Sequence, residues 1–171
     1  MNSITAKTAS LGFTLVEALL VLALIGILTA MSIPTVTNYT AKQNVDLATS
    51  SIIGNLNSLR ADAINGVTKW ATGDACPGLH LFGYQVVFLN GSYSYIADCV
   101  DDSNNHSYNR VGAKVDLTGY VAHIENPQTV EFVTLTGALY NSSGQTINIC
   151  SSNCTFTEPV NVTESGVIEG P

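Results

Sequence analysis

Hydrophobic residues are concentrated near the N-terminus of the chain, in one long stretch. Residues 18–31 read ALLVLALIGILTAM and contain no charge, and Glu17 is the only charged residue between Phe13 and Ile33. A helix over these residues would extend about 31 Å at about 1.5 Å per residue, which is enough to cross a bilayer. The pattern therefore predicts a transmembrane half-helix over residues 13–34.

The next segment, residues 35–66, has apolar residues spaced for one face of a helix. They recur at steps of three and four positions, as a helix requires: Val45, Ala48, Ile52, Leu56, Leu59 and Ala63. Gly66 suits the residue after a helix end, because glycine tolerates a positive φ. We therefore expect an amphipathic half-helix whose apolar face packs on a β-sheet, a commoner use of such stripes than a cofactor or partner groove.

Residues 67–171 contain short runs that alternate with the period of two typical of strands. Residues 79–89 and 93–100 flank Asn90-Gly91, a pair that favours a tight hairpin because both positions adopt positive φ. Residues 101–110 are polar throughout and predict a loop. Further short strands are expected within residues 67–71, 111–124, 129–135, 146–149, 155–157 and 160–168. A long helix followed by such strands indicates an α+β fold, with the helix packed on an antiparallel β-rich head.

Glu17 does not suit a membrane helix unless another group pairs with it. An unpaired carboxylate one turn inside a bilayer costs roughly several kcal/mol, so the residue requires a partner. A plain membrane anchor provides none. A cleaved secretory signal needs a small-x-small site after its apolar core, which residues 29–32 (TAMS) supply poorly. The membrane anchor and the cleaved secretory signal therefore fit the segment less well than a signal in which the carboxylate pairs with another group.

Such a signal is visible around Glu17. Residues 12–17 (GFTLVE), followed at once by the apolar run, resemble the leader junction of type IV prepilins and type II secretion pseudopilins. The resemblance implies that a prepilin peptidase cuts after Gly12, removing residues 1–12, and that Phe13 becomes an N-methylated N-terminus. It also implies that Glu17 pairs with the Phe13 amine of a neighbouring subunit, and that Pro34 kinks the helix.

The same resemblance implies where the chain works. It predicts a single-pass inner-membrane protein with its head in the periplasm, which joins other pilin or pseudopilin subunits in a type IV pilus or type II secretion pseudopilus. Residues 58–64 (SLRADAI) are similar to a stretch of the FimT-like and GspH-like minor pilins, although Asp62 stands where glutamate is commoner. The role implied is structural, in filament assembly.

Charge argues against DNA binding for uptake, a second role found in the FimT-like branch. The chain has 13 acidic and 6 basic residues and a net charge of -7, which loss of Lys7 with the leader would make -8. The DNA-binding tail of that branch has two arginines, whereas residues 165–169 here (SGVIE) keep only its glycine. An acidic head without those arginines repels phosphate, so DNA is not an expected partner.

Four cysteines follow the apolar segment: Cys76, Cys99, Cys150 and Cys154. In an exported domain they indicate two disulfides, for which three pairings are open. We favour Cys76 with Cys99, because a hairpin centred on residues 90–91 could bring them together, and Cys150 with Cys154 across a short loop. Zinc is the competing interpretation of the close pair, but neither a second close cysteine pair nor a histidine pair accompanies it, so no metal is expected.

The other titratable residues show no catalytic pattern. The three histidines stand apart in the sequence: His80, His106 and His123. No nucleophile elbow, phosphate-binding loop or dinucleotide fingerprint occurs. Asp98, Asp101 and Asp102 are close enough in sequence to suggest calcium, but they lack the EF-hand order, and a solvated loop is the simpler interpretation. We therefore expect neither an enzyme nor a bound cofactor.

Overall fold

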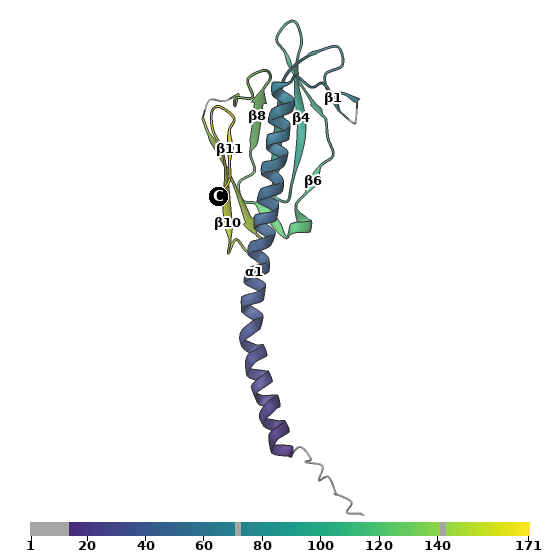
Figure 1. The fold of residues 1–171 in the computed structure, drawn as a ribbon. Helices are drawn as coiled ribbons and strands as arrows, with labels where there is room; N and C mark the ends of the chain where they lie inside the picture. Colours follow the sequence, from purple (N-terminus) through teal and green to yellow (C-terminus); the bar gives the residue numbers. More distant parts are fainter. Residues whose placement is uncertain (1–13, 71–72, 141–142) are drawn as a thin grey trace, which may run out of the picture. The chain divides into compact units, whose positions relative to one another are not determined.

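The computed structural model describes residues 14–70, 73–140 and 143–171, and Figure 1 shows their course. One long helix, α1 (Leu15–Ile64), is followed by short strands. The chain divides into two compact units between Tyr39 and Thr40. The first part of α1 belongs to one unit, and its last part belongs to the other together with the strands. The α+β class predicted from the sequence is confirmed.

Both ends of α1 have local signals that fix them. The Thr14 hydroxyl accepts a hydrogen bond from the Glu17 backbone N–H at 3.3 Å, the contact made by an N-cap residue. At the other end Gly66 has φ 60° and donates its N–H to the Ala63 carbonyl, while Val67 donates to the carbonyl one residue further back. These bonds form a Schellman motif, so the helix ends where its glycine predicts.

Short strands form most of the regular structure after α1, with one 3₁₀ turn, η1 (Thr118–Tyr120), among them. The strands are β1 Lys69–Trp70, β2 Gly73–Asp74, β3 His80–Leu89, β4 Ser92–Val100, β5 His106–Arg110, β6 Val115–Asp116, β7 Ala122–Ile124, β8 Thr129–Val133, β9 Gln145–Ser151, β10 Thr157–Val162 and β11 Ile168–Glu169.

In the described chain these strands form three antiparallel sheets. β1 pairs with β2 alone. The five-stranded sheet has the order β5-β4-β3-β8, with β6 also paired to β4, and the four-stranded sheet has the order β11-β10-β9-β7. Leu89 pairs with Ser92 across the Asn90-Gly91 turn, and β3 and β4 stay paired along their length apart from a bulge at residues 81–83. The hairpin expected from the sequence is therefore present.

Two details expected from the sequence are wrong. Residues 101–110 are not all loop, because residues 106–110 form the edge strand β5 paired to β4. The side chains of β5 are polar and mostly exposed, so the strand lacks the alternation that would reveal it. Residues 160–168 are not one strand either, because the chain turns between β10 and β11, where Gly166 has φ 75°.

The last part of α1 shares a core with the two larger sheets. The predicted stripe is 0–1 % exposed: Val45, Ala48, Ile52, Leu56, Leu59 and Ala63. It forms one cluster with inward-facing residues of both sheets, among them Tyr84, Phe132 and Ile149. Figure 1 shows this part of α1 running along the strands. The stripe is therefore core, and polar groups that act in the head must lie on other faces.

Candidate functional site

The first part of α1 is apolar and exposed. Its leucine, isoleucine and valine side chains between residues 15 and 28 are 42–76 % exposed. The Thr29 hydroxyl, a polar group in this segment, donates back to the Ile25 and Gly26 carbonyls at 2.9 and 3.0 Å. Glu17 is exposed in the first turn. A helix that is apolar on all sides is unfavourable in water, so this segment is suited to apolar surroundings.

The residues predicted for leader cleavage and methylation, Gly12 and Phe13, lie outside the described residues. Pro34 lies within α1, which continues past it, but its side chain is not among those described. Among the described residues, no helical stretch is both long and apolar enough to cross a membrane. The transmembrane half-helix over residues 13–34 and the kink at Pro34 therefore stay predictions.

The four cysteines form two disulfides in the pairing favoured from the sequence. Cys76 and Cys99 are joined, with Cα atoms 5.6 Å apart and both residues buried. This bond ties β4 to the segment before β3. Cys150, near the end of β9, is joined to Cys154 in the turn that follows, with Cα atoms 4.9 Å apart. The first disulfide therefore links two segments of the head, whereas the second closes a local turn.

A histidine lies against the second disulfide, a contact that sequence reasoning missed. His123 on β7 is opposite Cys150 in the pairing with β9, and its Nε2 lies 3.1 Å from Cys150 Sγ and 3.4 Å from Cys154 Sγ. Among the described residues, these three have the spacing of a metal site, because their possible ligand atoms all lie within 4.8 Å of one another. Metals bind thiolates, so with the sulfurs joined the arrangement is a disulfide beside an imidazole. No local signal could reveal it, because 27 residues separate His123 from Cys150.

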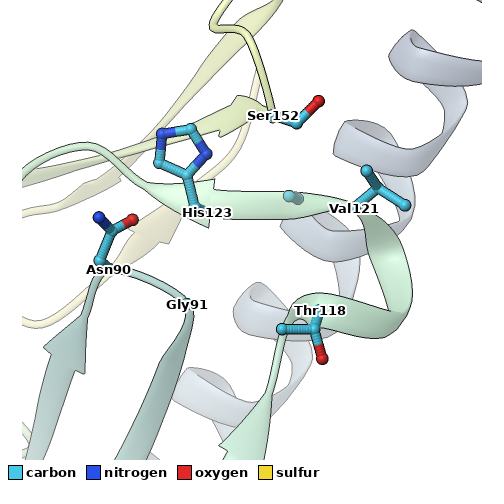
Figure 2. A pocket seen from close by; sticks show the side chains of 7 residues that line it. Asn90, Gly91, Thr118, Val121, His123 and Ser152 are labelled. Carbon is cyan, nitrogen blue, oxygen red and sulfur yellow. The ribbon is translucent and has the colours of Figure 1, made fainter.

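A pocket of about 500 Å³ opens beside this histidine. Its lining consists of Asn90, Gly91, Thr118, Val121, Ala122, His123 and Ser152. Figure 2 shows the His123 imidazole projecting from β7 toward the side on which Ser152 lies. Val121, which lines the pocket just before β7, has φ 51°, a value that β-branched residues rarely adopt. The pocket gives small solutes access to the imidazole.

Asp98 and Glu131 form an acidic pair on the five-stranded sheet. Asp98 Oδ2 lies 2.7 Å from His106 Nδ1, and Gln85 Nε2 donates to Glu131 Oε2 at 3.0 Å. The other two oxygens, Asp98 Oδ1 and Glu131 Oε1, are buried and have no hydrogen-bond donor in the described structure. Burial raises the pKa of Glu131 to about 7, and the neighbouring Asp98 carboxylate adds to the shift. A proton held between the two carboxyls would satisfy both oxygens near neutral pH.

The other two aspartates of the predicted cluster are engaged separately. Asp101 Oδ1 accepts the backbone N–H groups of Ser103 and Asn105, both at 2.8 Å. Hydrogen bonds from Asn105, above all, lower the pKa of Asp101. Asp102 is exposed, 3.4 Å from His80 Nε2. The three carboxylates therefore have separate partners: Asp98 contacts His106 and Glu131, Asp101 accepts hydrogen bonds within its own turn, and Asp102 lies at the surface near His80.

Arg60, near the end of α1, holds the C-terminal turn. Its Nε donates to the Gly137 carbonyl at 3.3 Å, and its Nη2 donates to the Ser165 carbonyl at 3.2 Å. Gly166 also lies close to the Gly137 carbonyl, so a Cβ added at Gly166 would be 1.8 Å from the Gly137 oxygen. One of the 6 basic residues of the chain, Arg60, thus binds backbone carbonyls.

Comparison with known proteins identifies the N-terminal segment. Residues 7–33 match the family model described as the prokaryotic N-terminal methylation motif, which is the type IV prepilin-like leader. The matched range includes Gly12, Phe13 and Glu17. No solved structure matches the chain.

Proposed function

We propose that this chain, which carries the prokaryotic N-terminal methylation motif of pilin-like and pseudopilin-like proteins at residues 7–33, is a minor pilin or pseudopilin. Its role would be structural, as a subunit that assembles into a type IV pilus or a type II secretion pseudopilus. The observation that carries the proposal is that the described part of the motif, from Leu15 on, lies on α1, where its leucine, isoleucine and valine side chains are exposed.

Assembly would proceed from the inner membrane. A prepilin peptidase would cut between Gly12 and Phe13, and the head would lie in the periplasm. The exposed leucines, isoleucines and valines of α1 then have two apolar environments in turn, the lipid and the helices of neighbouring subunits. Burial away from water stabilises each such side chain by about 1.5–3 kcal/mol, and both environments provide it, so the segment can pass from lipid to a filament without exposure to water.

Glu17 would set the register between subunits. Its carboxylate is costly among apolar helices unless a cation pairs with it, and the Phe13 amine released by cleavage is such a cation. Thr14 contributes by holding the first turn, since its hydroxyl already accepts the Glu17 N–H. A charge-assisted contact between one subunit's Glu17 and the next subunit's N-terminus would therefore favour one axial offset over others.

A DNA-binding role receives less support than a structural one. The net charge of -7 opposes phosphate, and Arg60 on α1 already donates to two backbone carbonyls. We expect no salt-sensitive DNA affinity in a gel-shift titration of the full chain in detergent at low salt. Tight binding that weakens as salt rises would instead favour the DNA-uptake role.

The assembly proposal is tested by changing Gly12 and Glu17. Gly12→Val places a branched side chain at the cleavage point, so we expect the leader to be retained and incorporation into filaments to be lost. Glu17→Ala should be cleaved normally but incorporate poorly, because the pairing carboxylate is gone. The size of the protein on a gel reports cleavage, and sheared filament fractions report incorporation.

Asp102→Ala is the matched control, because it removes an exposed carboxylate from the head and leaves the motif intact. This variant should be cleaved and incorporated like the native protein. Normal incorporation of both Gly12→Val and Glu17→Ala would overturn the proposal.

A further inference from the structure

The two disulfides differ in their access to reagents in solution. Cys76 and Cys99 are 3 % and 0 % exposed, and Cys99 Sγ lies 3.4 Å from the Ala75 carbonyl. Cys154 is exposed, whereas its partner Cys150 is fully buried. An incoming thiolate can therefore reach a sulfur of the second disulfide, on the Cys154 side, but finds the first one shielded.

The turn that contains the second disulfide keeps its shape through other bonds as well. The Cys154 N–H donates to the Ser151 carbonyl at 2.8 Å, and Ser151 N–H donates to the Phe156 carbonyl at 3.0 Å. The Ser151 hydroxyl lies 3.2 Å from the Thr155 hydroxyl. These contacts would hold the two sulfurs near each other after the S–S bond opens, so the disulfide can form again.

The two disulfides also differ in the backbone conformation of their cysteines. Cys154 has φ 47°, in the left-handed region that non-glycine residues other than asparagine and aspartate seldom adopt. The hydrogen bond from the Cys154 N–H to the Ser151 carbonyl holds the residue in this conformation. By contrast, neither Cys76 nor Cys99 has a positive φ.

His123 supplies a proton where the opening reaction needs one. Its Nε2 lies within 3.4 Å of both sulfurs, and the nearer one, at 3.1 Å, belongs to the buried Cys150. A thiolate released at Cys150 would be a charge in a fully buried position, which is unfavourable unless it is neutralised or hydrogen bonded. An imidazole N–H at this distance can do either.

We propose that Cys150–Cys154 is a redox-active disulfide that exchanges with an external dithiol, and that His123 is the acid–base group of the exchange. One thiolate of the dithiol attacks Cys154 Sγ, the Cys150–Cys154 bond breaks, and Cys150 leaves as a thiolate that takes the proton from His123 Nε2. In the mixed disulfide, one sulfur of the dithiol is bonded to Cys154 Sγ. The second thiolate of the dithiol then attacks that dithiol sulfur, and Cys154 leaves as a thiolate.

The balance of this exchange is two electrons and two protons. The dithiol is oxidised to a disulfide, and the protein disulfide is reduced to two thiols. The protons lost by the attacking thiols pass through solvent to restore the imidazole and to protonate Cys154. The pocket of about 500 Å³ beside His123 provides the route for solvent. The reverse reaction, with an external disulfide as oxidant, closes the bond again.

The Cys76–Cys99 bond is an internal reference for the test. The full chain in detergent would be treated with dithiothreitol for increasing times, and free thiols would be trapped with a maleimide and assigned by peptide mass. We expect Cys150–Cys154 to open at least about tenfold faster than Cys76–Cys99. Equal rates, or faster opening of Cys76–Cys99, would overturn the proposal.

His123→Ala tests the role of the imidazole. We expect reduction of Cys150–Cys154 to slow about tenfold and that of Cys76–Cys99 to stay unchanged. Added imidazole should restore the rate, because the adjacent pocket can admit it, and a purely structural role would not be rescued. A native rate in this variant, or no response to imidazole, would remove His123 from the exchange.

His80→Ala is the matched control, since His80 is an exposed histidine on another sheet and should leave both rates unchanged. His123→Gln keeps a side chain in the same place if the alanine variant does not fold, and it should slow Cys150–Cys154 without affecting Cys76–Cys99. A native rate in His123→Gln together with native fluorescence of Trp70 would also overturn the assignment.

Discussion

Two stretches of α1 both contain large apolar side chains, yet these have opposite exposure. Leu22 in the first stretch is 65 % exposed, whereas Leu56 in the second is 1 % exposed. The difference follows from spacing. Residues 18–31 are apolar on all sides of the helix, so no face suits water, whereas the later apolar residues form one stripe with polar residues between them. The chain's own sheets can bury an apolar stripe on one face of a helix, whereas a helix that is apolar on all faces is suited to lipid or to contact with other helices.

The largest expected effect is at the buried stripe. Leu56→Ala would remove a fully buried side chain between α1 and the sheets and leave a cavity, at a cost of about 2–5 kcal/mol in the free energy of unfolding. The measurement is chemical denaturation of the full chain in detergent, followed by the fluorescence of Trp70, the single tryptophan.

Leu22→Ala is the matched change in the exposed stretch. It should leave the unfolding transition reported by Trp70 within about 0.5 kcal/mol of native, because the side chain is not part of the head's core. Similar losses of stability in both variants would show that the contrast between the two stretches is wrong.

The second effect concerns carboxylates, which the two units accommodate differently. Glu17 is exposed, whereas Glu131 is partly buried beside Asp98 and its pKa is raised from 4.5 to about 7. The folded chain therefore holds a proton that the unfolded chain releases near 4.5, and the associated stability is lost as pH rises from about 4.5 to about 7. With solvent screening at this half-buried site, the loss is on the order of 1–2 kcal/mol.

Glu131→Gln should remove that loss. Its amide can donate to Asp98 Oδ1 at every pH, in place of the shared proton. We expect the variant to resemble the native protein at pH 5 and to be more stable than it at pH 8, as measured by denaturation at both pH values. Asp102→Asn, at an exposed carboxylate, should preserve the native pH dependence. An unchanged slope in Glu131→Gln would mean that Glu131 is ionised in the folded state.

The smallest effect is at the N-terminus of α1. Thr14→Ala would remove the hydroxyl that accepts the Glu17 N–H, at a local cost of about 0.5–1 kcal/mol for an exposed cap. Hydrogen exchange at the backbone amide of Glu17 should become several-fold faster, while exchange in the head stays unchanged. Thr14→Ser keeps the hydroxyl and should exchange like the native protein; equal exchange in all three would exclude the cap.

Much of the fold could be predicted because its signals are local. The stripe from Val45 to Ala63 follows a helical period, Gly66 ends α1, and Asn90-Gly91 specifies the β3–β4 turn. Strand β5 could not be predicted in this way, because an exposed polar edge strand is defined by its partner β4 rather than by its own pattern.

The chemistry of the head was harder to predict than its strands. His123 lies far from Cys150 in sequence, and only the pairing of β7 with β9 brings them together. Likewise, Glu131 and Asp98 belong to β8 and β4, which are separated by β3 in the sheet. Sequence spacing describes contacts within one element, whereas these contacts depend on the order of strands. The cysteine pairs were predictable because a hairpin and a short loop are local.

The contact between Arg60 and the C-terminal turn bears on the order in which the head can form. A chain that emerges N-terminus first exposes Arg60 long before Ser165, which lies 105 residues later. Throughout that interval the apolar stripe of α1 lacks part of its cover, since β10 and β11 are still to come. The newly made protein therefore depends on β10 and β11 to leave an aggregation-prone state, and deletion of β11 should arrest maturation rather than merely remove a strand.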